Sequence, residues 1–349
     1  MNILLLPIAF LYQMILTVRH KLYDWHLLKT RRYDRPVICV GNLSLGGTGK
    51  TPHVEYLIEA MSEQYRVCVV SRGYGRKTKG FLLGNASCCA ETIGDEPMQY
   101  VSKFDDLLVA VDENRNRAIE RMGTMNRPPD VYLLDDAFQH RSVTAGLNIL
   151  LTTYDKLYCD DLLVPAGTLR DVRSAARRAD IIVVSKSPKD LDEEQQAAVI
   201  NKLKPLSHQK VFFSFLEHKP LEPLNEAASK YESDETEDAL LFCGIAWPKP
   251  LKDELGKRHK HLETIVFSDH HSYTENDIKR VIKKFEQLPC ERKIIVTTEK
   301  DYARINNSPY ICKFESVPLF VAPIKVRFYE EEKFNEAILS YVRKNHQNR

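Results

Sequence analysis

The stretch of sequence that decides the fold runs from Val37 to Pro52 and reads VICVGNLSLGGTGKTP. It opens with an apolar, β-branched run that predicts a buried strand. A glycine-rich turn follows, and a helical pattern then extends from Val54 to Met61. A strand, a loop ending in Gly-Lys-Thr and a helix are the parts of a P-loop. Its glycines let backbone N–H groups approach phosphate oxygens, and the helix N-terminus adds a positive dipole end.

The turn therefore predicts an ATP-binding site. Lys50 would reach the β- and γ-phosphates, and the Thr51 hydroxyl would bind Mg²⁺. The usual pattern has a glycine where this chain has Ser44, so a glycine-rich turn that binds no phosphate is the alternative. A deviant P-loop with an additional lysine would need that lysine at position 45, which is a leucine. The predicted ATP-binding residues are Ser44, Leu45, Gly46, Gly47, Thr48, Gly49, Lys50 and Thr51.

Composition and charge indicate a folded protein and do not suggest binding to nucleic acid. The chain has 349 residues, of which 43% are hydrophobic and 28% are charged, and its formal net charge is +2. These values are typical of a folded protein of about two domains, without the strong positive charge of a nucleic-acid-binding surface. The eight cysteines are scattered without a C-x-x-C pair, and several lie in apolar runs. This predicts buried thiols in a reducing compartment.

The N-terminal segment has the pattern of a membrane-associated helix. Its first 18 residues carry no charge, and a basic segment with several aromatic residues follows between Arg19 and Arg35. The positive n-region and the small-residue cleavage site of a secretory signal are missing. Eighteen residues that include Pro7 and Gln13 are marginal for a full span. We expect the helix to lie at the membrane with its basic and aromatic residues at the cytoplasmic headgroups; a buried core helix is the alternative.

Apolar strands alternate with helical patterns through the rest of the chain. Strands are expected at residues 65–70, 107–111, 131–136, 147–151 and 180–186. This alternation predicts an α/β fold, with a mostly parallel sheet covered by helices on both faces. Acidic residues between positions 218 and 238 mark a domain boundary, after which a smaller α/β pattern begins. The predicted parts are a membrane-associated helix (1–22), a P-loop domain (23–225) and a C-terminal α/β domain (226–349).

Polar groups follow several of these strands, at the edge where open parallel sheets bind ligands. Asp135 and Asp136 end an apolar strand in the manner of a Walker B motif, which binds Mg²⁺; a helix cap is the alternative. The basic, glycine-rich loop at residues 71–80 suits a phosphate, with a solvated turn as the alternative. Asp95 and Glu96 precede a helical stretch and could simply cap it.

Two further motifs concern the nucleotide and the acid–base chemistry. The sequence Ser185-Lys186-Ser187-Pro188 is similar to the guanine-reading motif of GTPases but lacks its aspartate, which favours ATP over GTP. His270 and His271 are the only adjacent histidines. Adjacent side chains point in different directions, so they do not suit one metal ion. A histidine near an acid suits general acid–base work.

Together the motifs occur in the order typical of one protein family. They are NLSxGGTGKTP at 42–52, SRGYGR at 71–76, GDEP at 94–97, DDxFQH at 135–140, PAGxLR at 165–170, FCGIA at 242–246, DH at 269–270 and TEKD at 298–301. From its N-terminal helix to about residue 305, the chain closely resembles the tetraacyldisaccharide 4′-kinases, the lipid A 4′-kinases of Gram-negative bacteria. The serine at the first P-loop position belongs to that pattern. The chain departs from it at Ala137, Thr168 and Trp247, where glycine, proline and asparagine are common.

The resemblance implies a P-loop kinase at the cytoplasmic face of the bacterial inner membrane. Such an enzyme would transfer the γ-phosphoryl of ATP to the 4′-hydroxyl of a tetraacylated glucosamine disaccharide 1-phosphate, giving the 1,4′-bisphosphate in lipid A biosynthesis. Its cofactors would be ATP and Mg²⁺. Its partners would be the lipid A disaccharide 1-phosphate precursor and the inner-membrane lipid surface, with no nucleic acid.

The family pattern also implies roles for individual residues. Asp95 would accept the proton of the hydroxyl, assisted by His270 after closure of the second domain. The implied catalytic residues are Asp95, His270, Lys50, Arg115 and Arg170; the implied Mg²⁺ ligands are Thr51, Asp135 and Asp136; the expected substrate-binding residues are Arg72, Tyr74, Arg76, Gln139 and His140. A grip of Arg72 and Arg76 on the 1-phosphate is inferred from their charge.

Two other functions stay open from the sequence. A membrane-recruited nucleotide switch that acts on a protein partner would share the apolar helix and the P-loop. The missing lysine at position 45 and the missing guanine-reading aspartate count against it. A soluble small-molecule P-loop kinase would instead pack the N-terminal helix into its core.

Overall fold

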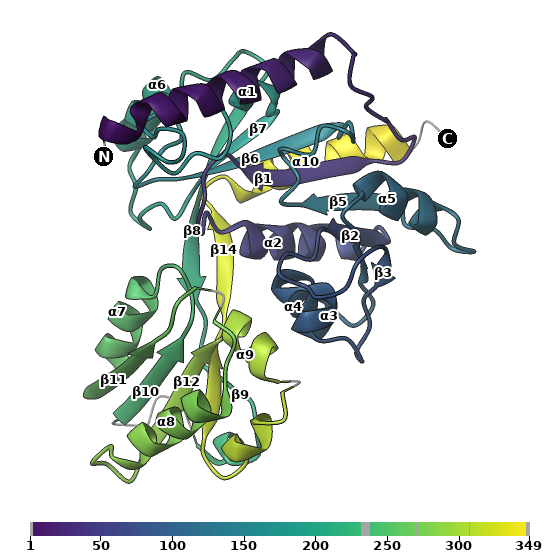
Figure 1. Ribbon diagram of the computed structural model, residues 1–349. Helices are drawn as coiled ribbons and strands as arrows, with labels where there is room; N and C mark the ends of the chain where they lie inside the picture. Colours follow the sequence, from purple (N-terminus) through teal and green to yellow (C-terminus); the bar gives the residue numbers. More distant parts are fainter. Residues whose placement is uncertain (1–2, 232–237, 270, 307, 347–349) are drawn as a thin grey trace.

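The computed structural model describes residues 3–231, 238–269, 271–306 and 308–346, and two β-sheets organise this part of the chain (Figure 1). In spatial order, the larger sheet contains β14 (Ile324–Phe328), β8 (Lys210–His218), β7 (Ile181–Ser185), β6 (Leu147–Thr153), β1 (Val37–Asn42), β5 (Val131–Asp135), β2 (Val67–Ser71), β4 (Leu108–Val111) and β3 (Leu82–Leu83). Neighbours from β8 to β4 are parallel, whereas the edge strands β14 and β3 are antiparallel to theirs. The predicted mostly parallel sheet is confirmed.

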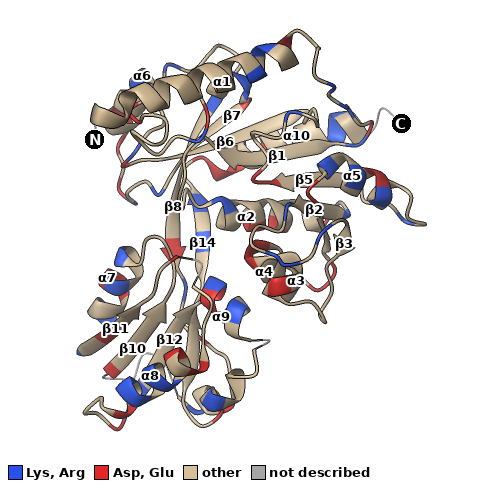
Figure 2. Ribbon diagram, viewed as in Figure 1, with Lys and Arg blue, Asp and Glu red and all other residues tan. Residues whose placement is uncertain are grey.

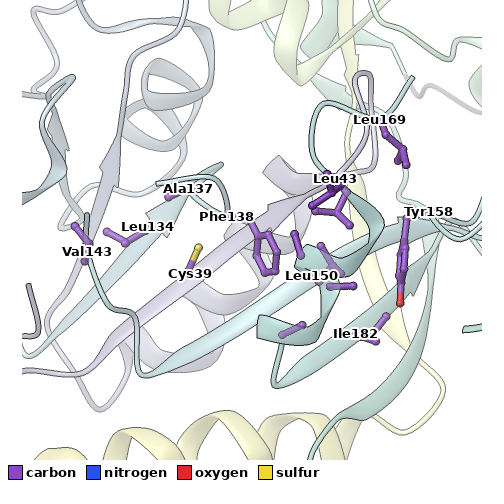
Figure 3. Packing of buried hydrophobic residues seen from close by; sticks show 14 of the residues in the cluster. Cys39, Leu43, Leu134, Ala137, Phe138, Val143, Leu150, Tyr158, Leu169 and Ile182 are labelled. Atoms are coloured by element: carbon purple, nitrogen blue, oxygen red, sulfur yellow. The ribbon is translucent and has the colours of Figure 1, made fainter. Parts of the chain in front are cut away.

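Helices cover both faces of this sheet. Successive side chains of a strand point to opposite faces, so Cys39 of β1 belongs to one apolar cluster and Ile38 and Val40 to the other. The first cluster, shown in Figure 3, takes in residues of α1 (Leu6–Asp24), α5 (Arg115–Gly123) and α6 (Glu193–Leu203). The second takes in residues of α2 (Lys50–Ser62), α4 (Asp95–Lys103) and α10 (Glu331–His346). A one-turn helix, α3 (Ala90–Ile93), precedes α4.

The smaller sheet repeats this arrangement with fewer strands. Its spatial order is β11 (His261–Val266), β10 (Asp238–Cys243), β12 (Lys293–Thr298), β13 (Leu319–Ala322) and β9 (Glu222–Pro223), of which only β9 is antiparallel among the described residues. One face packs on α7 (Lys249–Arg258), and the other packs on α8 (Glu275–Glu286) and α9 (Glu299–Ile305). The α/β pattern predicted after residue 238 is therefore present.

A two-stranded ribbon connects the sheets (Figure 1). The first half of β8 pairs with β7, and its second half, from Ser214 to His218, pairs with β14. The chain thus returns to the larger sheet after building the smaller one, and α10 packs there. Residues 324–346 therefore lie outside the C-terminal unit to which the predicted boundary at residue 226 assigns them. Stacking of Phe328 on Phe334, with ring centres 3.9 Å apart, helps to hold this returning segment in the larger core.

Helix α1 lies along the first face with its apolar side chains directed outward. Ala9, Leu16 and His20 are buried on the inward side, whereas Phe10, Leu11, Met14, Ile15 and Val18 are more than half exposed. Charged residues of α1 occur only near its C-terminal end (Figure 2). No helix in the described ranges is long and apolar enough to cross a membrane.

Candidate active site

The predicted P-loop connects β1 to α2 at the C-terminal edge of the larger sheet. Gly46 and Gly49 have φ values of +99° and +82°, which glycine adopts without strain. Asn42, at the end of β1, donates a hydrogen bond of 2.8 Å to the Thr48 hydroxyl. Ser185, at the end of β7, donates one of 2.8 Å to the Thr48 carbonyl. The centre of the turn is thus tied to two strand ends, which fixes its shape before any nucleotide binds.

Asp136 is the point where three predicted site residues meet. It follows the last residue of β5 in a left-handed conformation with φ +46°. Lys50 Nζ lies 3.7 Å from Asp136 Oδ2, and Arg170 donates hydrogen bonds to both Asp136 oxygens and to Asn42 Oδ1. Burial alone would raise the pKa of Asp136, but Lys50 and Arg170 hold it below its ordinary value. The Asp136 carboxylate is therefore stabilised in its charged form directly beside the P-loop.

Asp135 has the opposite electrostatic environment. It is buried at the end of β5 and accepts a hydrogen bond of 3.3 Å from the Tyr100 hydroxyl. Burial and the neighbouring carboxylates of Glu96 and Asp136 raise the pKa of Asp135 to about 7. A buried carboxylate that faces two others is costly to ionise unless a cation lies between them.

This donor set fits Mg²⁺. Among the described residues, no three His, Cys, Asp or Glu side chains form a complete metal-binding group. Mg²⁺ in a nucleotide site needs only one or two protein carboxylates or hydroxyls, because phosphates and waters supply the other ligands. Asp135 and Asp136 at the end of β5 and Thr51 in the first turn of α2 are placed to supply them.

Arg115 and His140 form a hydrogen-bonded pair close to Asp135 and Asp136. Arg115 is 2% exposed, and its Nη1 lies 3.3 Å from His140 Nε2. Because an arginine can only donate, His140 accepts this bond and is neutral. Burial lowers the pKa of Arg115 to about 10, and burial followed by the charges of Arg115 and Arg72 lowers the pKa of His140 to about 4. Gln139 beside them donates a hydrogen bond of 2.9 Å to the Asn42 carbonyl.

Asp95 lies where the two sheets meet, and an arginine of the smaller unit binds it. Arg304 Nε and Nη2 each lie 2.9 Å from Asp95 Oδ2. Two further ion pairs join the same helices, α4 and α9: Lys103 with Glu299 at 2.7 Å, and Glu96 with Lys300 at 3.6 Å. The smaller unit is thus fastened to the helix that carries the predicted base.

Other predicted residues are less closely associated. Arg72 and Tyr74 are exposed on the loop after β2. The Arg76 guanidinium is almost fully buried and pairs with Glu113 at 2.6 Å, so a grip on a phosphate would require it to leave Glu113. Its predicted role receives no support from this geometry. His270 lies outside the described residues.

Arg304 lies outside the motifs that predict the site, although its spacing from one of them is a usable signal. Arg304 follows Asp301 of the TEKD motif by three residues, a spacing that places two side chains on the same helix face. In the structure its Nη1 lies 2.9 Å from Asp301 Oδ1. Asn42 belongs to the NLSxGGTGKTP motif, which predicts no function for it. In the structure it contacts Thr48, Arg170 and Gln139.

Comparison with known proteins adds to this geometry. A family model described as tetraacyldisaccharide-1-P 4′-kinase matches residues 1–343. The chain belongs to this family. The 4′-kinase of Flavobacterium johnsoniae is 43% identical to it over 350 residues, which cover 99% of both chains. That of Bacteroides thetaiotaomicron is 40% identical over 357 residues, which cover 99% of this chain and 94% of the relative.

A solved 4′-kinase structure has the same fold along nearly the whole chain. It is described as the "apo" form of LpxK from Aquifex aeolicus in complex with ATP. The two chains are 31% identical, the TM-score is 0.71, and the match covers 97% of this chain and 98% of the other. The family resemblance and the P-loop α/β fold predicted from the motifs are therefore confirmed.

Proposed function

We propose that this member of the 4′-kinase family transfers the γ-phosphoryl of ATP to the 4′-hydroxyl of a tetraacylated glucosamine disaccharide 1-phosphate. Its product would be the 1,4′-bisphosphate, a lipid A precursor. The observation that carries the proposal is the convergence of Lys50 and Arg170 on Asp136 beside the P-loop, in a chain that matches the family over residues 1–343. The family assignment favours a kinase over a nucleotide switch.

Phosphoryl transfer depends on placing the reactants and neutralising charge. Lys50 and Arg170 supply positive charge at the P-loop. Both side chains point toward the Asp136 carboxylate, so their charges are concentrated at the same place. Asp135, Asp136 and Thr51 would hold Mg²⁺, which neutralises phosphate charge when bound. Arg115, buried behind them, adds a third cation. We assign these residues to ATP and metal binding on that basis.

The acceptor hydroxyl also needs a group that receives its proton. Asp95 is our candidate, because it begins helix α4 beside Glu96 and faces the second unit through Arg304. Each ion pair between α4 and α9 joins two helices that pack on different sheets, so these pairs support a role for closure of the smaller unit in completing the site. We retain His270, which neighbours Asp269 in the sequence, as the assisting residue.

The acceptor would approach from the cytoplasmic face of the inner membrane. Helix α1 supports this, because its outward residues are apolar and its last two turns carry Arg19 and Lys21. The inward side of α1 contacts the site: the Tyr12 hydroxyl donates to the Arg170 carbonyl at 3.2 Å, and Arg19 donates to the Gln139 carbonyl at 3.0 Å. A lipid bound at α1 would therefore lie close to the phosphoryl-transfer residues.

The test is incubation of the purified protein with Mg²⁺, γ-labelled ATP and a lipid A disaccharide 1-phosphate in detergent micelles. We expect the label in a lipid that carries two phosphates. A matched reaction with the Lys50→Met variant should transfer none. Absence of labelled lipid with the wild-type protein, under conditions in which it binds ATP, would refute the proposal.

A further inference from the structure

A small group of residues beside the P-loop has no role in the mechanism above. A Cβ atom placed on Gly47 would lie 3.5 Å from the Ala246 Cβ and 3.9 Å from Lys186 Nζ. Lys186 Nζ in turn lies 4.4 Å from the centre of the Trp247 ring. Three separate segments therefore meet here: the P-loop, the end of β7, and the loop after β10 of the smaller sheet. Both distances are those of ordinary van der Waals contact, so the three segments lie directly against one another.

The position of Lys186 is specified by its surroundings. It follows the last residue of β7 with φ +56°, a conformation that is unusual for lysine. Its neighbour Ser185 binds the Thr48 carbonyl, so the strand end and the P-loop form one rigid unit. Burial lowers the pKa of Lys186 to about 8, although Asp155 partly offsets this. Lys186 is a partly buried ammonium that lies on an indole face and makes no salt bridge with a described residue, which suggests a ligand-binding role.

We propose that Lys186 and Trp247 form the binding site for the purine ring of ATP. This inference rests on the proposed function for the identity of the nucleotide. With the phosphates inside the P-loop turn, the ribose and base must extend past its rim along the C-terminal ends of the strands. Strand β7 is separated from β1 by one strand, β6, so the two strands are about 10 Å apart. Lys186 reaches this rim beside Gly47, and Trp247 packs against Lys186, so both side chains lie where the base would leave the turn.

The chemistry of the two side chains suits a base. An indole offers a flat apolar face for stacking, and the lysine stem and ammonium can pack on a π-system. Stacking of a nucleic-acid base on an aromatic side chain strengthens binding by about 5- to 150-fold. A site that binds the flat face of the base does not need a carboxylate to hydrogen-bond the edge of the base. In agreement with this, the position at which GTPases have such an aspartate is Pro188. The site therefore takes a purine by its faces and brings the smaller unit onto the nucleotide.

Tryptophan fluorescence provides a direct test, since the chain contains only Trp25 and Trp247. In a Trp25→Phe background, Trp247 becomes the only reporter. We expect MgADP to change its emission with saturation. Magnesium tripolyphosphate, which has the phosphates without the base, should compete with ADP for the site yet leave the emission unchanged. The same change with both ligands would overturn the proposal, and so would no change with ADP when competition shows that ADP binds.

Kinetics give an independent readout in the same background. Trp247→Asn and Lys186→Met should each raise the KM for ATP at least fivefold without raising the KM for the lipid acceptor. Trp247→Phe, which keeps a stacking face, should restore most of the loss. Lys189→Met, at an exposed lysine three residues from Lys186, is the matched control. An unchanged KM for ATP in Trp247→Asn would refute the assignment. If the wild-type protein transfers no phosphate to the lipid, the proposed function fails, while the fluorescence titration still decides the base site.

Discussion

Arg304→Met is expected to weaken the junction between the two sheets and to misplace Asp95. The Arg304 side chain is 5% exposed and makes four close contacts with described residues. Two reach Asp95 Oδ2 at 2.9 Å, one reaches Asp301 Oδ1 at 2.9 Å, and one reaches the Gly244 carbonyl at 3.0 Å. Methionine keeps most of the apolar volume and removes all four donors.

The expected loss in the free energy of unfolding depends on which hydrogen bonds Asp95 and Asp301 keep after the substitution. Removing one partner of a buried ion pair costs about 3–5 kcal/mol. Asp301 is fully buried but still accepts bonds from the Thr298 hydroxyl at 2.6 Å, the Tyr273 hydroxyl at 3.0 Å and the Gly244 amide at 3.0 Å. Asp95 is partly exposed, so water can solvate it. We therefore expect a loss at the lower end, about 3 kcal/mol in the free energy of unfolding.

A double-mutant cycle in urea unfolding measures this coupling. Arg304→Met, Asp95→Asn and the double variant should give a coupling energy of about 1.5 kcal/mol or more. The matched control is Arg258→Met, because Arg258 makes a partly exposed pair with Glu254 within α7 and should change stability by less than about 1 kcal/mol. Equal effects of Arg304→Met and Arg258→Met, or additivity in the cycle, would refute the reasoning.

Three further predictions concern the site itself. Asp95→Asn should lower kcat for the lipid by about 10²- to 10⁴-fold and leave the Kd for ATP, measured by calorimetry, near the wild-type value; near-normal turnover would remove Asp95 from its role. Asp135→Asn should raise the Mg²⁺ concentration for half-maximal turnover by about tenfold or more, because one of few protein ligands becomes a neutral amide; an unchanged Mg²⁺ titration would assign the metal elsewhere. His140 should make the folded state less stable as pH falls. The unfolded chain binds a proton at this residue near pH 6.5 and the folded chain only near pH 4, so stability decreases through that window. Urea midpoints between pH 7 and 5 should fall less in His140→Gln than in the wild type, and parallel pH dependences would contradict this.

The sequence predicted best those elements whose pattern is local. The strand expected at residues 131–136 matches β5 to within one residue, because a strand buried on both faces is an uninterrupted apolar run. The β8–β14 ribbon was not predicted. Its second half, Ser214–His218, pairs with residues 324–328, more than a hundred positions later, and half-exposed strands carry a weak pattern. No local signal specifies a partner at that distance.

The site shows the same division between local and long-range information. Lys50, Asp136 and Arg170 belong to separate motifs, and the fold brings the three side chains into contact beside the P-loop. The sequence gives the charge of Arg76 but not its partner, and Glu113, 37 residues away, is the group that the arginine contacts. Charge alone therefore predicts which residues can bind a phosphate, whereas the fold decides which of them already have a partner.

Helix α1 contributes to the protein in two ways that different substitutions can separate. Its inward side supports the site: His20 Nε2 lies 2.6 Å from Asp171, next to Arg170, and Arg141 donates to the other ring nitrogen at 3.2 Å. Deleting the helix would thus damage the site as well as any membrane contact. Replacing Phe10 and Ile15, which point outward, by glutamine should reduce binding to anionic vesicles and leave transfer in detergent micelles intact. His20→Ala should lower transfer in micelles and leave vesicle binding largely unchanged. If both changes act alike in both assays, α1 does not divide its roles between its two faces.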